Sequence, residues 1–183
     1  MKAFLTLLAL LQSAGMNVDR VSIPGPDGAT LAAALVRPVG PTMVPSVVAL
    51  HGCGGPFPAR DGQWAIALAK AGHAVLLPDS FGSRGLGSQC GVAQRAVTPE
   101  GLRRLDAIAA AKWLRSASGI PAGEIDLIGW SNGGSTVLQV ARARSDLPAG
   151  LFQRFVAFYP GCPSGRRDMG AGRSHAYPHG RGR

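Results

Sequence analysis

Ile125-Asp-Leu-Ile-Gly-Trp-Ser-Asn-Gly-Gly134 is the stretch of this chain that decides its fold. The apolar run at its start predicts a buried strand, and residues 129–133 after it have the G-x-S-x-G spacing of a nucleophile elbow. In such an elbow a sharp turn from strand to helix lifts the serine out of the sheet. The pattern therefore predicts Ser131 as a nucleophile. A glycine-rich helix start with an incidental N-cap serine is the purely structural alternative.

A second loop contributes to the same predicted site. The sequence His51-Gly-Cys-Gly-Gly55 follows directly after an apolar run at 46–51, and its glycines allow the backbone to approach a bound oxyanion. The backbone N–H groups of Asn132 and Cys53 are the two donors that we expect to hold such an oxyanion. The glycines that we expect to support the two loops are Gly52, Gly54, Gly55, Gly129 and Gly133.

Other polar residues near these loops have weaker claims to a catalytic role. His51 could act as a general base, although orienting its own loop is the commoner use of such a histidine. Cys53 could be a nucleophile, but no base is evident beside it. Asp79, at a strand end, is expected to cap or anchor a loop rather than to serve as a displaced catalytic acid. His73 lies at a helix-to-strand junction and is expected to be structural.

Strands alternate with helices along the chain, which predicts an α/β fold with a mostly parallel sheet. The turn at 24–28 joins the first two strands into an antiparallel hairpin. The loop at 80–97, which includes Arg84, is long enough to form the lip of a pocket. The predicted strands are 18–23, 30–36, 46–51, 74–77, 125–130 and 152–159, and two predicted helices are 63–71 and 132–142.

Capping signals set the starts of two helices. Asp61 is the expected N-cap of the helix at 63–71. A further helix is expected to begin at Thr98 as N-cap, with Pro99 at its first position. Its expected buried stripe consists of Leu102, Leu105, Ala109 and Trp113.

Several spaced motifs together resemble the dienelactone hydrolase family, and especially its exported members with a serine nucleophile. The resemblance implies an α/β-hydrolase fold with helices on both faces of the sheet. It also implies hydrolysis of a small-molecule ester or lactone through acyl-Ser131, with Asn132 and Cys53 as oxyanion donors and with no metal or organic cofactor. Dienelactone hydrolases proper use cysteine as the nucleophile, so serine here does not indicate dienelactone itself. The motifs are 51–55, Leu76-Leu-Pro-Asp-Ser-Phe-Gly82, Gly85-Leu-Gly-Ser-Gln-Cys90, 129–134 and Phe158-Tyr-Pro-Gly-Cys162.

The end of the chain departs from that family pattern. Family members continue past the Tyr-Pro-Gly-Cys motif with two further strands, which carry the catalytic Asp and then the His. Here residues 163–183 form a Gly/Arg-rich tail with no apolar run, which predicts disorder and a truncation or frameshift after Cys162. We therefore expect residues 16–162 to be an incomplete α/β-hydrolase domain that lacks its C-terminal strands and helices. The triad Asp and His are not identifiable, since the tail residues Asp168, His175 and His179 have nothing to dock them against Ser131. A catalytically inactive remnant is the alternative function.

Composition limits the remaining classes. The 183 residues suit one domain. Of the net charge of +9, the tail contributes +4 through five arginines and one aspartate, and no basic helix face interleaved with aromatic residues indicates nucleic-acid binding. A module that binds nucleic acid or a membrane surface through its basic tail is the third alternative. Oligomeric state stays open.

Cysteine usage and the N-terminus bear on the compartment. Residues 1–15 combine Lys2, an apolar run and small residues suited to cleavage after Gly15, which predicts a secretory signal peptide and a periplasmic or secreted protein. An ordinary N-terminal helix is the alternative. No stable membrane insertion is expected after cleavage, because the run is too short to span a bilayer. Three cysteines, Cys53, Cys90 and Cys162, allow at most one internal disulfide, and their spacing fits no metal site.

Overall fold

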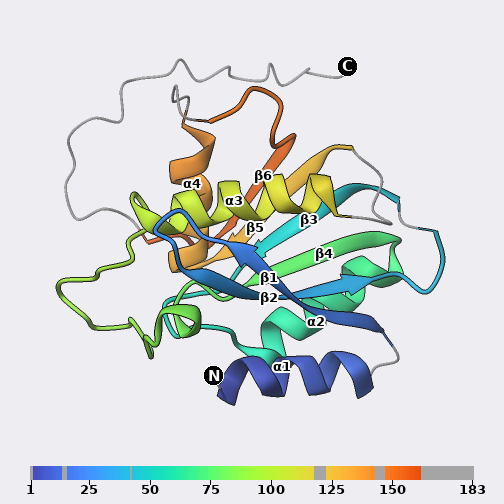
Figure 1. The fold of residues 1–183 in the computed structure, drawn as a ribbon, viewed down its shortest axis with the longest axis horizontal. Helices are drawn as coiled ribbons and strands as arrows, with labels where there is room; N and C mark the ends of the chain where they lie inside the picture. The colour runs from blue at the N-terminus through green and yellow to red at the C-terminus, as the bar shows by residue number, and fades with distance from the viewer. Residues whose placement is uncertain (1, 14–15, 42, 118–122, 143–146, 162–183) are drawn as a thin grey trace, which may run out of the picture.

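A computed structural model describes residues 2–13, 16–41, 43–117, 123–142 and 147–161. Six strands form one sheet in the order β1-β2-β4-β3-β5-β6, with helices on both sides (Figure 1). The strands are β1 (Asn17–Pro24), β2 (Thr30–Arg37), β3 (Met43–Leu50), β4 (His73–Pro78), β5 (Ile125–Trp130) and β6 (Arg154–Phe158). The helices are α1 (Lys2–Ser13), α2 (Pro58–Lys70), α3 (Leu102–Ser116) and α4 (Asn132–Ala141), with a short 3₁₀ helix, η1 (Gly82–Arg84).

The strand pairing confirms the predicted mostly parallel α/β sheet. β1 and β2 form the expected antiparallel hairpin, and β2 also pairs antiparallel with β4. The pairs β3–β4, β3–β5 and β5–β6 are all parallel. The carboxyl ends of β3, β4 and β5 therefore meet at one edge of the sheet, where ligands of open α/β sheets bind.

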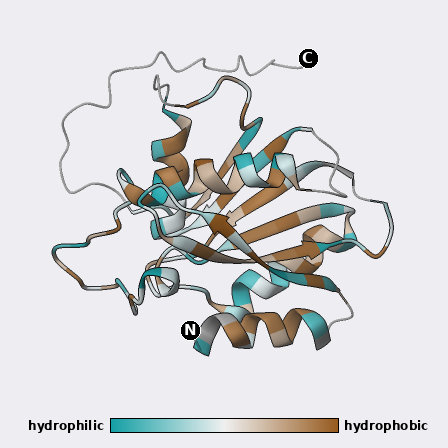
Figure 2. Ribbon diagram, viewed as in Figure 1, coloured by the Kyte–Doolittle hydropathy of each residue, from teal (hydrophilic) through white to brown (hydrophobic). Residues whose placement is uncertain are grey.

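Two apolar cores lie on opposite faces of the sheet, because successive side chains of a strand point to opposite sides. In β3, Val48 and Leu50 face the core under α3 and α4, whereas Val47 and Ala49 face the core under α1 and α2. The continuous apolar runs of the inner strands are visible as brown ribbon in Figure 2. Burial on both faces explains why these strands lack a polar alternation.

The helix α2 begins five residues earlier than the capping signal predicts. Pro58 occupies the first turn, where its missing N–H costs nothing. Asp61 is not the N-cap; it lies inside the helix and reaches back, so that its carboxylate accepts a hydrogen bond from the Phe57 N–H at 2.7 Å. The Asp61 carboxylate thus pairs a backbone N–H at the start of the helix, as an N-cap side chain would, but it does so from within the first turn.

The helix α3 begins later than expected and buries a different face. Residues 99–101 form a turn in which the Thr98 hydroxyl accepts from the Gly101 N–H at 3.1 Å, so the helix starts at Leu102. The expected stripe is only partly buried, with Leu105, Ala109 and Trp113 packed against the margin of the core. The fully buried residues are Arg103, Arg104, Asp106, Ala107, Ile108, Ala110, Ala111 and Leu114.

The strand β6 forms one edge of the sheet and carries exposed apolar side chains. It is shorter than the predicted 152–159 strand, and within the described residues its strand partner is β5. Phe155 and Val156 are 37 % and 42 % exposed, although they point to opposite faces. An edge that is apolar on both faces has the composition of an interior strand. Cys162 and the predicted tail lie outside the described residues.

The N-terminal segment forms a helix that packs on α2. Leu7 and Leu11 of α1 are buried, and Leu10 touches Gly62 so closely that a Cβ there would lie 2.7 Å from its side chain. In the described part of the chain, each helix is too short or too polar to cross a membrane. Cleavage after Gly15 stays a prediction.

Candidate active site

Ser131 occupies a strained turn between β5 and α4. Its φ of 53° and ψ of −114° place a residue with a side chain in a region that usually requires glycine. The Ser131 N–H donates to the Phe158 carbonyl at 3.0 Å, and the Ser131 carbonyl accepts from Ser135 N–H at 2.8 Å. The side chain is partly exposed. The structure thus shows the strand–turn–helix geometry that the elbow pattern predicts.

The glycines of the elbow permit direct backbone contact. A Cβ on Gly133 would lie 2.3 Å from the Leu50 carbonyl oxygen and 2.6 Å from that of His51. A Cβ on Gly129 would lie 2.5 Å from the Gly133 carbonyl group. Gly134, which the sequence analysis did not single out, has the same constraint, with the Phe158 carbonyl at 2.8 Å. No larger residue fits at these positions without movement of the backbone.

The loop at 51–55 lies beside the elbow. The point where a Gly52 Cβ would stand is 3.7 Å from the Ser131 Cβ and 3.6 Å from the Trp130 carbonyl oxygen. Gly52 and Gly55 close the loop through a backbone hydrogen bond of 3.3 Å, and Gly55 has a φ of 86°. Gly54 has open space around it and is not packed against the elbow. The residues expected to supply the two oxyanion donors therefore come from segments in mutual contact.

A disulfide ties this loop to the next one. Cys53 is bonded to Cys90, and the Cys53 carbonyl accepts a hydrogen bond from the Gln89 N–H at 2.7 Å. The pairing that the sequence left open is thereby resolved in favour of these two cysteines. It also removes the alternative of Cys53 as a nucleophile, because a disulfide sulfur is not a thiolate.

His51 is buried and orients its own loop. Its Nε2 accepts a hydrogen bond from the Ser80 N–H at 3.3 Å, which assigns the hydrogen to Nδ1, where it is donated to the Gly52 carbonyl at 2.8 Å. Burial, followed by the positive charges of Arg103 and Arg60, holds the pKa of His51 well below its usual value. Both ring nitrogens are occupied, so this imidazole is not placed to deprotonate Ser131.

The remaining candidates have structural roles. Asp79 anchors the start of the long loop, where its Oδ1 accepts from Phe81 N–H at 3.1 Å and Gly82 N–H at 2.8 Å. The His73 ring bonds the Pro45 carbonyl at 2.7 Å. The prediction that the loop at 80–97 forms the lip of a pocket stays a prediction, while Arg84 within it has a structural partner on each side. Its guanidinium bridges two carboxylates, those of Asp27 and Asp106, each at 2.8 Å.

Arg103 is the functional candidate that the sequence analysis missed. It is fully buried, with Nη1 donating to Asn132 Oδ1 at 2.5 Å and Nη2 donating to the His51 carbonyl at 2.9 Å. Its guanidinium also lies 4.8 Å from the centre of the Phe81 ring. Burial lowers the pKa of Arg103 to about 10, so the group stays charged at pH 7. No sequence signal distinguishes it, because adjacent arginines near a helix start usually indicate a solvated surface.

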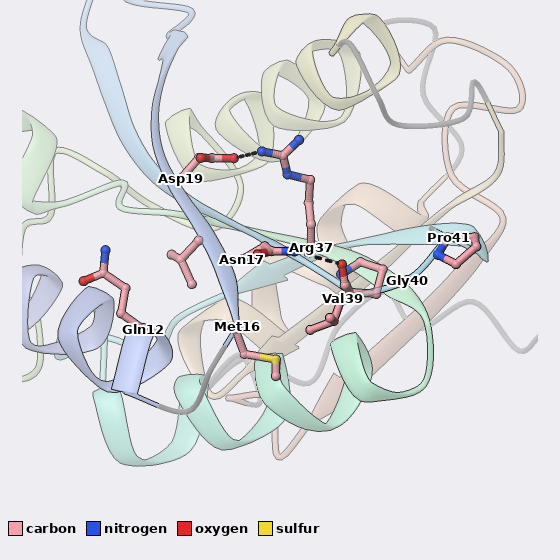
Figure 3. A pocket seen from close by; sticks show the side chains of 10 residues that line it. Gln12, Met16, Asn17, Asp19, Arg37, Val39, Gly40 and Pro41 are labelled. Atoms are coloured by element: carbon pink, nitrogen blue, oxygen red, sulfur yellow. Dashed lines mark hydrogen bonds and ion pairs between the residues drawn. The ribbon is translucent and has the colours of Figure 1, made fainter.

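A cavity within the described residues lies away from Ser131. About 650 Å³ in volume, it opens where β1 begins and β2 ends, beside the last turn of α1 (Figure 3). An ion pair between Arg37 and Asp19 crosses its wall. Val36 of β2 pairs with Val75 near the start of β4. This cavity therefore lies at the amino ends of the parallel strands, whereas the elbow lies at their carboxyl ends. Among the residues described, no cluster of three or more metal-ligating side chains is present.

The sheet order, the strained serine and the neighbouring glycine loop define an α/β-hydrolase. A sequence profile of the dienelactone hydrolase family matches residues 31–172, and the chain belongs to that family.

Solved structures share this fold. Esterase Est22 aligns with a TM-score of 0.64 at 24% identity, covering 85% of this chain and 48% of Est22. A putative dienelactone hydrolase from Klebsiella pneumoniae aligns with a TM-score of 0.63 at 19% identity, covering 84% and 63% of the two chains. An esterase from Pyrobaculum calidifontis aligns with a TM-score of 0.58 at 24% identity, covering 87% and 51%. The chain thus spans roughly half to two thirds of their lengths.

Substituting Gly133 should test the contact between elbow and β3. In Gly133→Ala the new methyl group collides with two backbone carbonyls, and we expect the free energy of unfolding to fall by at least about 3 kcal/mol. Gly54→Ala is the matched control, because its methyl group enters open space. Urea denaturation of both variants gives the comparison. Equal losses in the two would contradict the close approach.

The pKa of His51 predicts a loss of stability in mild acid. The unfolded chain takes up a proton as the pH falls through about 6.5, while the folded protein keeps His51 neutral. The free energy of unfolding should therefore decrease below that pH, by up to about 1.4 kcal/mol per pH unit, until the folded-state pKa is reached. Melting curves from pH 8 to 5 should show a steeper decline for the wild type than for His51→Gln. Parallel curves would rule out a neutral buried imidazole.

Proposed function

We propose that this protein is a serine hydrolase that cleaves a carboxylic ester or lactone through an acyl-Ser131 intermediate. The observation that carries the proposal is the positive φ of Ser131 at the end of β5, beside the loop at 51–55. Strained backbone persists where the surrounding structure holds it, and such sites are concentrated at catalytic centres. Membership of the dienelactone hydrolase family and likeness to esterase folds support the same reaction class.

The proposed reaction uses the backbone for its electrostatic part. The Ser131 hydroxyl attacks the substrate carbonyl, and the negative charge that develops on its oxygen lies between the N–H groups of Asn132 and Cys53. Asn132 begins α4, whose first N–H groups have no partner within the helix and whose dipole favours negative charge. Collapse of the tetrahedral intermediate expels the alcohol and leaves acyl-Ser131, which water then hydrolyses.

Activation of Ser131 requires a base from outside the described residues. The two histidines within them, His51 and His73, bond Ser80 N–H, Gly52 carbonyl and Pro45 carbonyl groups rather than Ser131. A serine hydroxyl is a weak nucleophile until an imidazole takes its proton. This requirement favours one second candidate, a catalytically inactive remnant that keeps the nucleophile and the donors without the triad Asp and His.

A serine-directed fluorophosphonate probe tests the proposal directly. We expect the wild type to be labelled and Ser131→Ala to remain unlabelled, because the probe traps only an activated serine. Ser135→Ala is the matched control, since Ser135 lies one turn further along α4 with its hydroxyl near the Ser131 and Gly161 carbonyls. Mass spectrometry of the adduct and release of p-nitrophenol from a short-chain ester provide the two readouts. An unlabelled wild type would favour the inactive remnant.

We also propose that the protein is exported. The basic start and apolar run of residues 1–15 support this compartment, and so does the Cys53–Cys90 disulfide, because disulfides persist in oxidising surroundings. In the uncleaved chain, Leu7 and Leu11 keep α1 packed through their buried side chains.

Export predicts a defined mature chain. Protein recovered from a bacterial periplasm should begin at Met16, as read from its intact mass. Leu8→Arg interrupts the apolar run and should leave uncleaved protein in the cytoplasm. If the wild-type protein is absent from the periplasm and retains residues 1–15, α1 is instead a permanent helix of the domain.

A further inference from the structure

Arg103 makes its contacts with two neutral oxygens rather than with a carboxylate. Its two terminal nitrogens bond the Asn132 side chain and the His51 main chain, 29 and 52 residues away in sequence. These two acceptors belong to the two segments expected to hold the oxyanion. A guanidinium has a rigid planar fork, so a single arginine fixes the distance between the two acceptors that it bridges.

The charge of Arg103 is balanced from a distance. The buried carboxylates of Asp106, Asp79 and Asp61 all favour its charged form. Each of them is bonded elsewhere: Asp106 to Arg84, Asp79 to the N–H groups of Phe81 and Gly82, and Asp61 to Phe57 N–H and Arg60. The two terminal nitrogens of Arg103 therefore bond the elbow and the loop at 51–55 instead of a carboxylate.

Stability alone is a weak reason for such an arrangement. An apolar side chain of similar size often stabilises a protein as well as or better than a buried charged group. Features that depart from this rule tend to occur where function requires a fixed geometry. The stacked ring of Phe81, 4.8 Å from the guanidinium, further limits how the fork can rotate.

We propose that Arg103 is a positioning residue that clamps the elbow to the loop at 51–55 and so fixes the spacing of the Asn132 and Cys53 N–H donors. The role rests on the proposed serine hydrolase function. Arg103 contacts neither substrate nor the reacting atoms; it acts through the Asn132 side chain and the His51 carbonyl. Displacing a donor by about 1 Å can lower the reaction rate about 100-fold.

The test uses Arg103→Lys, which keeps the charge but has no fork to reach both acceptors. We expect the maximal rate of fluorophosphonate labelling to fall by about 10- to 100-fold with little change in probe affinity. Amide hydrogen exchange should rise in the peptides that contain 51–55 and 131–134. Arg115→Lys is the matched control, because Arg115 lies on the same helix and bonds carbonyls at 150–151, away from the site.

Two outcomes would overturn the clamp: wild-type exchange in both peptides of Arg103→Lys, or labelling at the wild-type rate. If the wild type itself is not labelled, the serine hydrolase proposal fails, while the exchange comparison still decides the role of Arg103. Should Arg103→Lys fail to fold, Asn132→Ala removes the same contact from the other end and is expected to raise exchange in the same two peptides. Unchanged exchange in the 51–55 peptide of that variant would also overturn the proposal.

Discussion

The close approach of Gly133 to the carbonyl oxygens at the end of β3 is the contact on which the site depends. Without a side chain at this position, the first turn of α4 lies directly against Leu50 and His51. The approach brings the elbow of β5 beside the loop that leaves β3, although about 80 residues separate them in the sequence. Because both partners are backbone, this close approach requires a residue without a side chain at position 133.

A layer of buried charge surrounds that contact. Arg103 lies among three buried carboxylates, and the neutral His51 stacks edge-on against Phe81 at 4.9 Å. Charges removed from water are tolerated where partners and hydrogen bonds compensate them. Here the carboxylates hold loop ends in place and at the same time favour the charge on Arg103. The charges of these groups are therefore coupled, and the loss of a carboxylate would leave the charge on Arg103 less well compensated.

Much of this architecture could be predicted from the sequence, for identifiable reasons. Buried parallel strands appear as continuous apolar runs, so β3, β4 and β5 were located to within a few residues. The elbow was predictable because its glycines and serine are adjacent in the chain. The buried face of α3 was not, because it includes charged residues such as Arg103 and Asp106, which an apolar spacing does not reveal. Arg103 was missed because its partners lie far away in sequence, and the two carboxylate partners of Arg84 were unpredictable for the same reason.

The distribution of catalytic groups along the chain explains why the site is recognisable while a base is absent from the described residues. The nucleophile and the two proposed donors come from β5, α4 and the loop after β3, all of which the described sheet positions. Their geometry depends on backbone packing, so it forms whether or not an imidazole is present. A base, in contrast, contributes only when it is held within hydrogen-bond reach of the serine. A site with oxyanion donors but no triad still accelerates the hydrolysis over the reaction in water, whereas the full rate of a serine hydrolase requires the complete triad. The fold of this chain therefore determines where acyl transfer would occur, and the supply of an imidazole determines how fast it could proceed.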